Sequence, residues 1–241
     1  MVRIILLALC FTTLRMSAVP PPSESPYYRV SMVQAAPGKL TELIDLYKKE
    51  LAATTAAGDE APLWMRHSQG DHWDLMILQP MSPLLYWSAE RQQKRVQAME
   101  PFAEAIRNDT AWQEDLYCTG PPAGELRKAF AAGTFFHVEM FVVLPGHFVD
   151  LHRERDMENA YARALHQPEN FIFLRESGAA WDLFTIGVFR DLKHYAESAN
   201  LTPEQQDAAA KAAGFESASQ IGPYLRRFIS THHDTLAVAI K

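Results

Sequence analysis

The sequence predicts an α+β protein made of two tandem copies of one βαββαβ unit. Three observations predict it: a repeat at a fixed offset of 108 residues, the same order of strand-like and helix-like segments in both copies, and a proline-rich break between them. Trp73-Asp74-Leu75 recurs as Trp181-Asp182-Leu183, and Pro37-Gly38 recurs as Pro145-Gly146. Twelve of the 52 aligned pairs from position 27 to 78 are identical, whereas random pairing would give about 3 at ordinary residue frequencies.

In the first copy, each element is indicated by its residue pattern. β-branched and aromatic residues before Pro37-Gly38 predict a strand and a turn, and apolar residues at helical spacing after it predict a helix. Two short apolar runs around Gly70 predict a hairpin. The predicted elements are a strand over 28–35, a helix over 40–54, strands over 63–67 and 73–79, a helical region over 84–107 and a strand over 112–118.

The second copy repeats this order, with its hairpin around Gly178. Its later helical region contains a clear helix start, because Thr202 can cap the helix, Pro203 suits the first position and Gln205 the third. The predicted elements are a strand over 135–144, a helix over 148–165, strands over 171–175 and 181–189, a helical region and a strand over 234–240. The predicted organisation is repeat 1 over 27–120, a linker over 121–132 and repeat 2 over 133–241.

The N-terminal residues differ from the rest in composition. A short basic start at Met1-Val2-Arg3 is followed by an apolar run over 4–14, small residues and the proline break at 20–22. This pattern is typical of a secretory signal peptide over 1–19, followed by a disordered proline-rich segment over 20–26. We therefore expect a periplasmic or secreted protein. A chance apolar stretch in a disordered N-terminus is the alternative.

Charge and composition narrow the classes of partner. The formal net charge is −6, which argues against the broad basic surface of a nucleic-acid-binding protein. After residue 20 no apolar run approaches the roughly 20 residues that span a membrane, so we expect no membrane span in the mature chain. Removal of the signal peptide would leave Cys118 as the only cysteine, which excludes an internal disulfide.

The repeat architecture, the strand–Pro-Gly–helix pattern and the paired tryptophans together resemble the dimeric α/β-barrel superfamily. The resemblance covers about residues 27–241. It implies two ferredoxin-like units whose antiparallel sheets face each other, as in antibiotic-biosynthesis monooxygenases, NIPSNAP-type proteins, haem-degrading monooxygenases and the chlorite dismutase group. No catalytic signature of these groups is matched residue by residue, and the fold hosts many functions. Activity is therefore not inherited from the resemblance.

Differences between the two copies indicate where chemistry is placed. In the first helix, the apolar residues Ile44, Tyr47 and Leu51 of copy one become His152, Arg155 and Asn159 in copy two. These positions share one helical face, and a buried polar trio is costly unless it is hydrogen-bonded or lines a cavity. This favours a pocket in repeat 2, with catalytic candidates His152, Arg155, Asn159 and Glu158. A slight rotation of the helix that leaves these residues at its edge is the alternative.

A second difference lies on the first strand, where Arg29 and Ser31 correspond to His137 and Glu139. If Val138 and Met140 meet the helices, strand alternation directs His137 and Glu139 into the interface between the sheets. They are candidates for ligand binding, as a proton-transfer pair or half of a metal site, or else a polar bridge. The hairpin adds two further ligand-binding candidates, Arg175 and Trp181, although the recurrence of the tryptophan favours packing. We assign no metal ligands; a metal at the 232–234 histidine–aspartate run is a weaker alternative.

These features leave three classes of function open. The favoured one is an exported small-molecule-binding protein or cofactor-independent monooxygenase-like enzyme that takes a small apolar or aromatic molecule. The alternatives are a haem or tetrapyrrole binder, which needs a free imidazole in an apolar cleft, and a non-catalytic protein that acts by assembly. A homo-oligomer is compatible with each class. The sequence requires no cofactor, and haem is the alternative to be tested.

Overall fold

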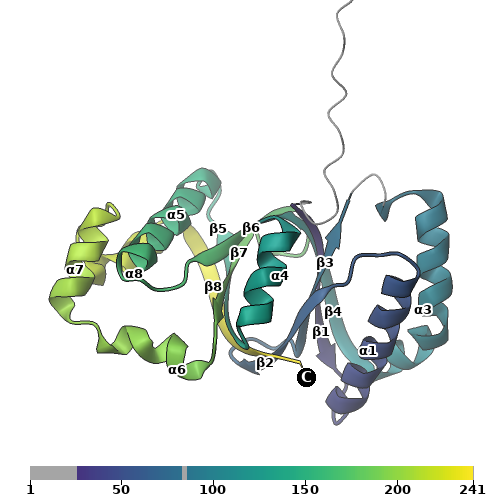
Figure 1. Ribbon diagram of the computed structural model, residues 1–241. Helices are drawn as coiled ribbons and strands as arrows, with labels where there is room; N and C mark the ends of the chain where they lie inside the picture. Colours follow the sequence, from purple (N-terminus) through teal and green to yellow (C-terminus); the bar gives the residue numbers. More distant parts are fainter. Residues whose placement is uncertain (1–25, 83–85, 241) are drawn as a thin grey trace, which may run out of the picture.

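The computed structural model describes residues 26–82 and 86–240. The predicted signal peptide over 1–19 and all but the last residue of the proline-rich segment over 20–26 lie outside the described residues. Eight strands of the described chain form one closed barrel, and helices cover its two outer sides (Figure 1). No helix in this part of the chain has both the length and the apolar composition needed to cross a membrane.

Repeat 1 forms a four-stranded antiparallel sheet in the order β4-β1-β3-β2. Two helices pack on its outer face, and β1 ends at the predicted Pro-Gly turn, where Gly38 has a positive φ of 77°. The elements are β1 (Tyr27–Ala35), α1 (Leu40–Ala56), β2 (Leu63–Gln69), β3 (Leu75–Met81), α3 (Ala89–Asp109) and β4 (Thr110–Thr119). Ser88 caps α3 by accepting a hydrogen bond from the Arg91 amide.

Repeat 2 has the same sheet order, β8-β5-β7-β6. The linker between the repeats forms α4 (Ala123–Ala132). The elements of repeat 2 are β5 (Phe135–Val143), α5 (Phe148–Ala164), β6 (Asn170–Gly178), β7 (Leu183–Phe189), α6 (Leu192–Tyr195), α7 (Pro203–Ala212), α8 (Ile221–Leu225) and β8 (Ile229–Ala239), with short 3₁₀ turns at Ala196–Asn200 and Ala218–Gln220. The predicted capping box at Thr202 and Gln205 is present.

The two sheets join edge to edge, β2 to β8 and β4 to β6. One recurring glycine sits at each junction. A Cβ on Gly70 would lie 2.2 Å from the Asp234 carbonyl oxygen, and one on Gly178 would lie 2.4 Å from that of Asp115. Only glycine therefore lets each hairpin approach the last strand of the other repeat. The predicted α+β fold of two tandem ferredoxin-like repeats with facing sheets is confirmed.

The barrel interior is the main core. Tyr28, Val30 and Met32 of β1 face Phe136, Val138 and Met140 of β5 across it. α4 packs onto this cluster and lies between the two outer helical layers in Figure 1. Burial of these side chains on all sides follows from closure, which leaves no sheet edge exposed to solvent.

The direction expected for His137 and Glu139 is wrong. They share a strand face as predicted, but the opposite residues, Val138 and Met140, fill the barrel interior rather than the helix interface. His137 and Glu139 therefore lie on the outer side, beneath α5. The reason is that both faces of β5 are covered, and the helix-side cluster around Phe141 and Leu151 is smaller than the barrel core. Hydrophobicity alone cannot rank two buried faces of one strand.

The last strand of each repeat is longer than predicted. β8 begins at Ile229 rather than at 234, because Thr231 and the following histidines pair with β5 although they are polar, and Ser230 lies at an irregularity in the pairing. Backbone pairing does not depend on side-chain polarity, and the outer face of this strand is partly open to solvent. Polar residues therefore hid the start of the strand.

Candidate functional site

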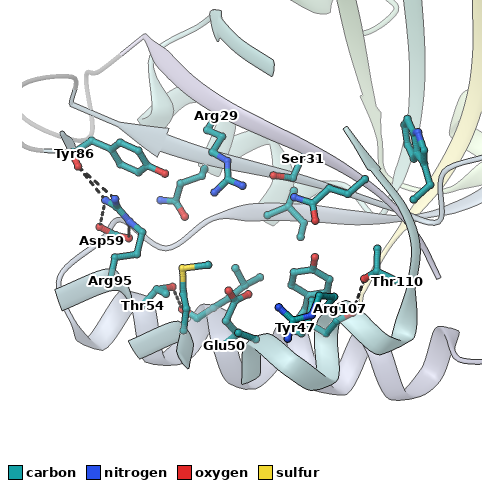
Figure 2. Close-up of a pocket in the computed structure, with 18 of the residues that line it drawn as sticks. Arg29, Ser31, Tyr47, Glu50, Thr54, Asp59, Tyr86, Arg95, Arg107 and Thr110 are labelled. Carbon is teal, nitrogen blue, oxygen red and sulfur yellow. Dashed lines mark hydrogen bonds and ion pairs between the residues drawn. The ribbon is translucent and has the colours of Figure 1, made fainter. Parts of the chain in front are cut away.

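The candidate site is a cavity of about 430 Å³ on the outer side of repeat 1. It lies between α1, α3 and the sheet, and its floor is formed by β1, β3 and β4 (Figure 2). The sequence of each element fits this position. The outward-facing strand residues Arg29, Ser31 and Gln79 turn polar groups to the cavity, while Leu51 and Ile106 from the helices supply apolar wall. Mixed walls of this volume are typical of small-molecule sites.

Glu50 of α1 is a buried carboxyl in the wall. The side chain is buried, with 6% of its surface exposed, and within the described chain it makes no hydrogen bond or ion pair. Burial raises the pKa of the Glu50 carboxyl above its ordinary value of 4.5, and the charge of Arg29 opposes the rise only in part. A carboxyl of this kind takes up a proton readily, as a general base must.

Tyr47 lies one helical turn before Glu50 and also lines the cavity (Figure 2). Its ring is buried against Leu43 and Val33. Burial, with the Glu50 charge second, raises the pKa of the Tyr47 phenol, which keeps it protonated at neutral pH. The phenol is therefore a fixed hydrogen-bond donor or acceptor for a bound molecule.

A polar cage on the floor surrounds Asp115 of β4. Arg29 donates to one carboxylate oxygen at 3.1 Å, and Ser31 donates to the other at 2.5 Å. Gln113 donates to both from the neighbouring position on β4, at 3.3 and 3.1 Å. The negative charge of Asp115 is thereby balanced within the protein. Because Asp115 partly neutralises Arg29, the positive charge of Arg29 acts only weakly on a ligand or on Glu50.

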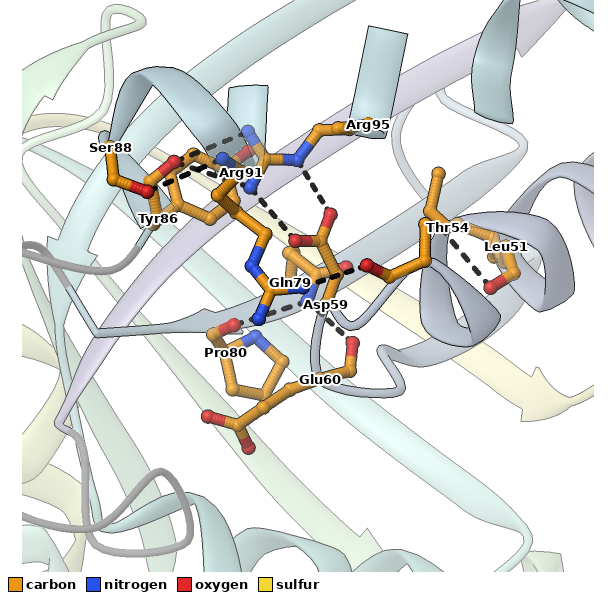
Figure 3. Close-up of polar contacts among 11 residues, drawn as sticks. Leu51, Thr54, Asp59, Glu60, Gln79, Pro80, Tyr86, Ser88, Arg91 and Arg95 are labelled. Atoms are coloured by element: carbon orange, nitrogen blue, oxygen red, sulfur yellow. Dashed lines mark hydrogen bonds and ion pairs between the residues drawn. The ribbon is translucent and has the colours of Figure 1, made fainter. Parts of the chain in front are cut away.

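The end of the cavity near Tyr86 is braced by a separate set of contacts (Figure 3). Arg95 pairs with Asp59 through two hydrogen bonds of 2.5 and 2.9 Å, and its guanidinium lies 3.6 Å from the centre of the Tyr86 ring. Arg91 donates to the Ala57 carbonyl at 2.7 Å. Both arginines come from α3, so these contacts tie the start of α3 to the segment that follows α1.

The corresponding region of repeat 2 holds a buried ion network. Arg155 of α5 is buried with 1% of its surface exposed, and three carboxylates surround its guanidinium: Glu154 at 2.6 Å, Glu158 at 2.8 Å and Glu139 at 3.3 Å. Burial raises the pKa of Glu154 and of Glu158. Their neighbouring carboxyls raise it further, and the one cation that they share, Arg155, opposes the rise only in part. The structure thus brings Arg155, Glu158 and Glu139 together, as an ion network.

The other residues singled out from the sequence lie apart from one another. Asn159 holds the start of β6, since its amide exchanges two hydrogen bonds with the backbone of Asn170, at 2.9 and 2.7 Å. His152 lies half-buried on α5. Arg175 pairs with Asp182, and Trp181 packs in the barrel core. Catalytic or ligand-binding roles for these residues stay predictions.

The cavity in repeat 1 was missed because its key residues are unremarkable in sequence. Glu50 and Glu158 are identical in the two copies, so a search for differences passes over them. The informative difference is at the preceding turn. Arg155 neutralises Glu158 in repeat 2, whereas Tyr47 leaves Glu50 without a cation of its own on the helix. The sequence feature that indicates the cavity is a glutamate present in both copies whose neighbouring arginine is present only in repeat 2.

Comparison with solved structures finds the same architecture. An anthrone oxidase-like protein matches with a TM-score of 0.52 and 12% identity, covering 90% of this chain and 92% of that one. A candidate monooxygenase from Fusobacterium nucleatum matches with a TM-score of 0.56 and 10% identity, over 90% and 93% of the two chains. One from Lactobacillus acidophilus gives 0.52 and 9%, over 89% and 94%.

The chain has the dimeric α/β-barrel fold. No protein-family model matches it, and no curated protein matches it by sequence. At identities near 10% the similarity concerns the fold, which hosts many functions. Any statement about activity has to come from the site.

Among the residues described, the repeat 1 cavity lacks the two commonest ligands of haem, the alternative cofactor raised from the sequence. The described wall contains no histidine or cysteine, and the residues in it of types that ligate haem iron are Tyr47, Tyr86 and Met99. We derive no haem chemistry at this cavity. Haem binding elsewhere in the chain stays a prediction.

Proposed function

We propose that the repeat 1 cavity binds a small aromatic molecule and that Glu50 abstracts a proton from it, as the first step of a cofactor-independent, monooxygenase-like oxidation. The observation that carries the proposal is the unpaired, buried Glu50 carboxyl in the wall of a cavity of about 430 Å³. This is the class favoured from the sequence, but with its pocket in repeat 1 instead of repeat 2.

The groups around Glu50 suit this step. A carboxylate without a fixed cation is a stronger base than one held in an ion pair, because nothing stabilises its charge before the reaction. As the substrate loses its proton, negative charge develops on the bound molecule. Arg29 and the Tyr47 phenol lie in the same wall and stabilise that charge electrostatically and by hydrogen bonding.

The overall reaction needs no external reductant if the substrate carries an activated methylene group. Proton loss gives a carbanion, which transfers electrons to dioxygen and forms a carbon–oxygen bond. Loss of water from the resulting hydroperoxide converts the methylene to a ketone, so that one substrate and one O₂ give one ketone and one H₂O. Anthrone is a suitable probe, because its methylene is acidified by the flanking aromatic rings and one structural neighbour is described as anthrone oxidase-like.

The test compares wild type with two cavity variants, using anthrone as the probe. Glu50→Gln keeps the shape of the side chain but removes the base, and should lower the rate of anthraquinone formation by about 10²–10⁴-fold with little change in probe binding. Leu51→Trp fills the cavity and should abolish probe-induced thermal stabilisation. Glu42→Gln, on the exposed side of the same helix, is the matched control and should behave as wild type.

Two results would count against the proposal. One is turnover by Glu50→Gln at the wild-type rate, which would remove the carboxyl from the reaction. The other is probe binding that Leu51→Trp leaves unchanged, which would place the ligand elsewhere.

We further propose that the chain acts in the periplasm or outside the cell. The support is the basic, apolar and small-residue pattern of the first 19 residues. N-terminal sequencing of the protein recovered from each cell fraction tests it. A mature chain that begins near residue 20 is expected, and a full-length chain confined to the cytoplasm would contradict export.

A further inference from the structure

A second group of reactive side chains lies on the outer face of repeat 2, where β5 and β8 run side by side. His137 and Glu139 on β5 and Asp234 on β8 each offer one ligand atom, and these atoms lie within 4.8 Å of one another. His232 adds a second imidazole, since its Nε2 lies 3.3 Å from Asp234 Oδ2 while His137 Nε2 lies 3.5 Å from Oδ1. Two imidazoles thus flank the two oxygens of one carboxylate.

Strand register explains this grouping. Glu139 is directly opposite Asp234, and Phe141 is opposite His232. Residues two apart on a strand share a face, so that His137, Glu139, His232 and Asp234 all project to the same side. In the sequence, the pair His137 and Glu139 and the 232–234 run are separate features; pairing of β5 with β8 makes them one cluster.

The corresponding positions of repeat 1 form the Asp115 cage described above. Ser31 is opposite Asp115 and Val33 is opposite Gln113, as Glu139 is opposite Asp234 and Phe141 opposite His232. In repeat 1 the central aspartate receives hydrogen bonds from an arginine, a serine and a glutamine. In repeat 2 these three donors are replaced by His137, Glu139 and His232, all of which are common metal ligands.

The exchange also removes the fixed positive charge. The four carboxyls around this face are Glu139, Asp234, Glu154 and Glu158, and among the described residues Arg155 is the one guanidinium that contacts any of them. Burial raises the pKa of Glu154 to about 8, so these carboxyls do not all carry a charge at neutral pH, but they still outnumber the guanidinium that contacts them. Asp234 is half-exposed, with 54% of its side-chain surface accessible, so that a cation and its waters can reach the cluster from solvent.

We propose that His137, Glu139, Asp234 and His232 bind one divalent transition-metal ion, and that this ion supplies the charge that Arg29 supplies in repeat 1. Zinc–nitrogen and zinc–oxygen bonds are about 2.0–2.2 Å long and the ion is usually tetrahedral, so its ligand atoms lie about 3.3–3.6 Å from one another. The two imidazole–carboxylate distances, 3.5 Å from His137 and 3.3 Å from His232 to Asp234, match this spacing. The wider spread of up to 4.8 Å among His137, Glu139 and Asp234 has to close when the ion binds. Imidazole and carboxylate ligands suit zinc, iron and manganese rather than calcium.

The site is independent of the cavity proposed for aromatic binding. It lies on the other repeat and shares no residue with that cavity. Loss of the metal should therefore leave probe binding by repeat 1 intact. Failure of either proposal does not affect the other.

Zinc retention by untagged, EDTA-treated full-length protein is the test. The protein is incubated with Zn²⁺ at pH 7.5 and desalted, and bound zinc is counted by elemental analysis. Wild type should retain one zinc per chain and gain thermal stability from it. His137→Gln and His232→Gln should each bind at least about tenfold more weakly, because even the loss of an outer-shell partner costs 10–100-fold. Co²⁺ substitution should give ligand-field absorption bands in wild type only.

The control is the adjacent histidine on the opposite face. His233 contacts Asp71, which also contacts His72, so these three residues are the alternative place for an ion. His233→Gln should retain zinc as wild type does. Absence of zinc from wild type would overturn the proposal and indicate that protonated imidazoles balance Asp234. Loss of zinc in His233→Gln but not in His137→Gln would also overturn it, by moving the ion to Asp71.

Discussion

At the scale of single residues, the ionised Glu50 carboxylate that the proposed reaction needs is expected to lower the stability of the fold. Its pKa is raised by burial in the folded chain, so ionised Glu50 disfavours folding. Glu50→Gln should therefore increase the free energy of unfolding at neutral pH. The gain should be full above the folded-state pKa and should vanish as pH falls below the ordinary value of 4.5, where both states carry a protonated carboxyl. Urea denaturation between pH 4 and pH 8 measures it. A destabilised variant at pH 8 would contradict the unpaired state of Glu50.

Arg155, in contrast to Glu50, is expected to stabilise the fold. It neutralises Glu139, Glu154 and Glu158 in a buried setting, so Arg155→Met should leave their charges uncompensated and cost about 3–5 kcal/mol. His152→Ala, one turn earlier on the same helix, is the comparison and should cost under about 1 kcal/mol. Equal stabilities of the two variants by chemical denaturation would show that the network is not formed.

At the scale of elements, the junctions between the repeats depend on glycine. Gly70 and Gly178 combine a positive φ with close approach to the backbone of β8 and β4 respectively. Gly70→Ala and Gly178→Ala should each lower stability by the cost of the left-handed conformation, roughly 1 kcal/mol, plus about 1–3 kcal/mol for overpacking. Thermal or urea unfolding measures the loss.

The turns after β1 and β5 provide matched controls for this prediction. Gly38 and Gly146 also have a positive φ, but a Cβ there would meet no atom within 4 Å. Their alanine variants should therefore show the conformational cost alone. If all four variants were equally destabilised, close packing at the junctions would not be what requires glycine.

At the scale of the whole molecule, closure of the barrel should make the two repeats unfold together. Each sheet has its edges covered only by the other, through β2–β8 and β4–β6, and the main core contains residues of both. Tryptophan fluorescence and far-ultraviolet circular dichroism should give one coincident transition. Two separated transitions, with Gly70→Ala shifting only one, would indicate independent repeats.

How much of the fold and of the candidate site can be predicted from the sequence depends on whether a feature is local or needs the arrangement of the whole molecule. The repeat, the strand order and the turns at Gly38 and Gly146 can be predicted from local patterns, because turn residues and hydrophobic periodicity involve only residues that are close in the sequence. The cavity does not, since Glu50 and Tyr47 look like an ordinary helix stripe until α3 is placed over them. The His137–Asp234 cluster needs the pairing of β5 with β8, whose members are almost 100 residues apart.

The most direct test of the central claim, that Glu50 is the base of a repeat 1 site, is the pH dependence of kcat/KM for anthrone oxidation. Wild type should lose activity as pH falls through an apparent pKa above 4.5, because burial raises the pKa of Glu50 and only the carboxylate accepts a proton. In Glu50→Gln this acidic limb should be absent from a residual rate about 10²–10⁴-fold lower. An acidic limb of the same position and size in both proteins would contradict the claim.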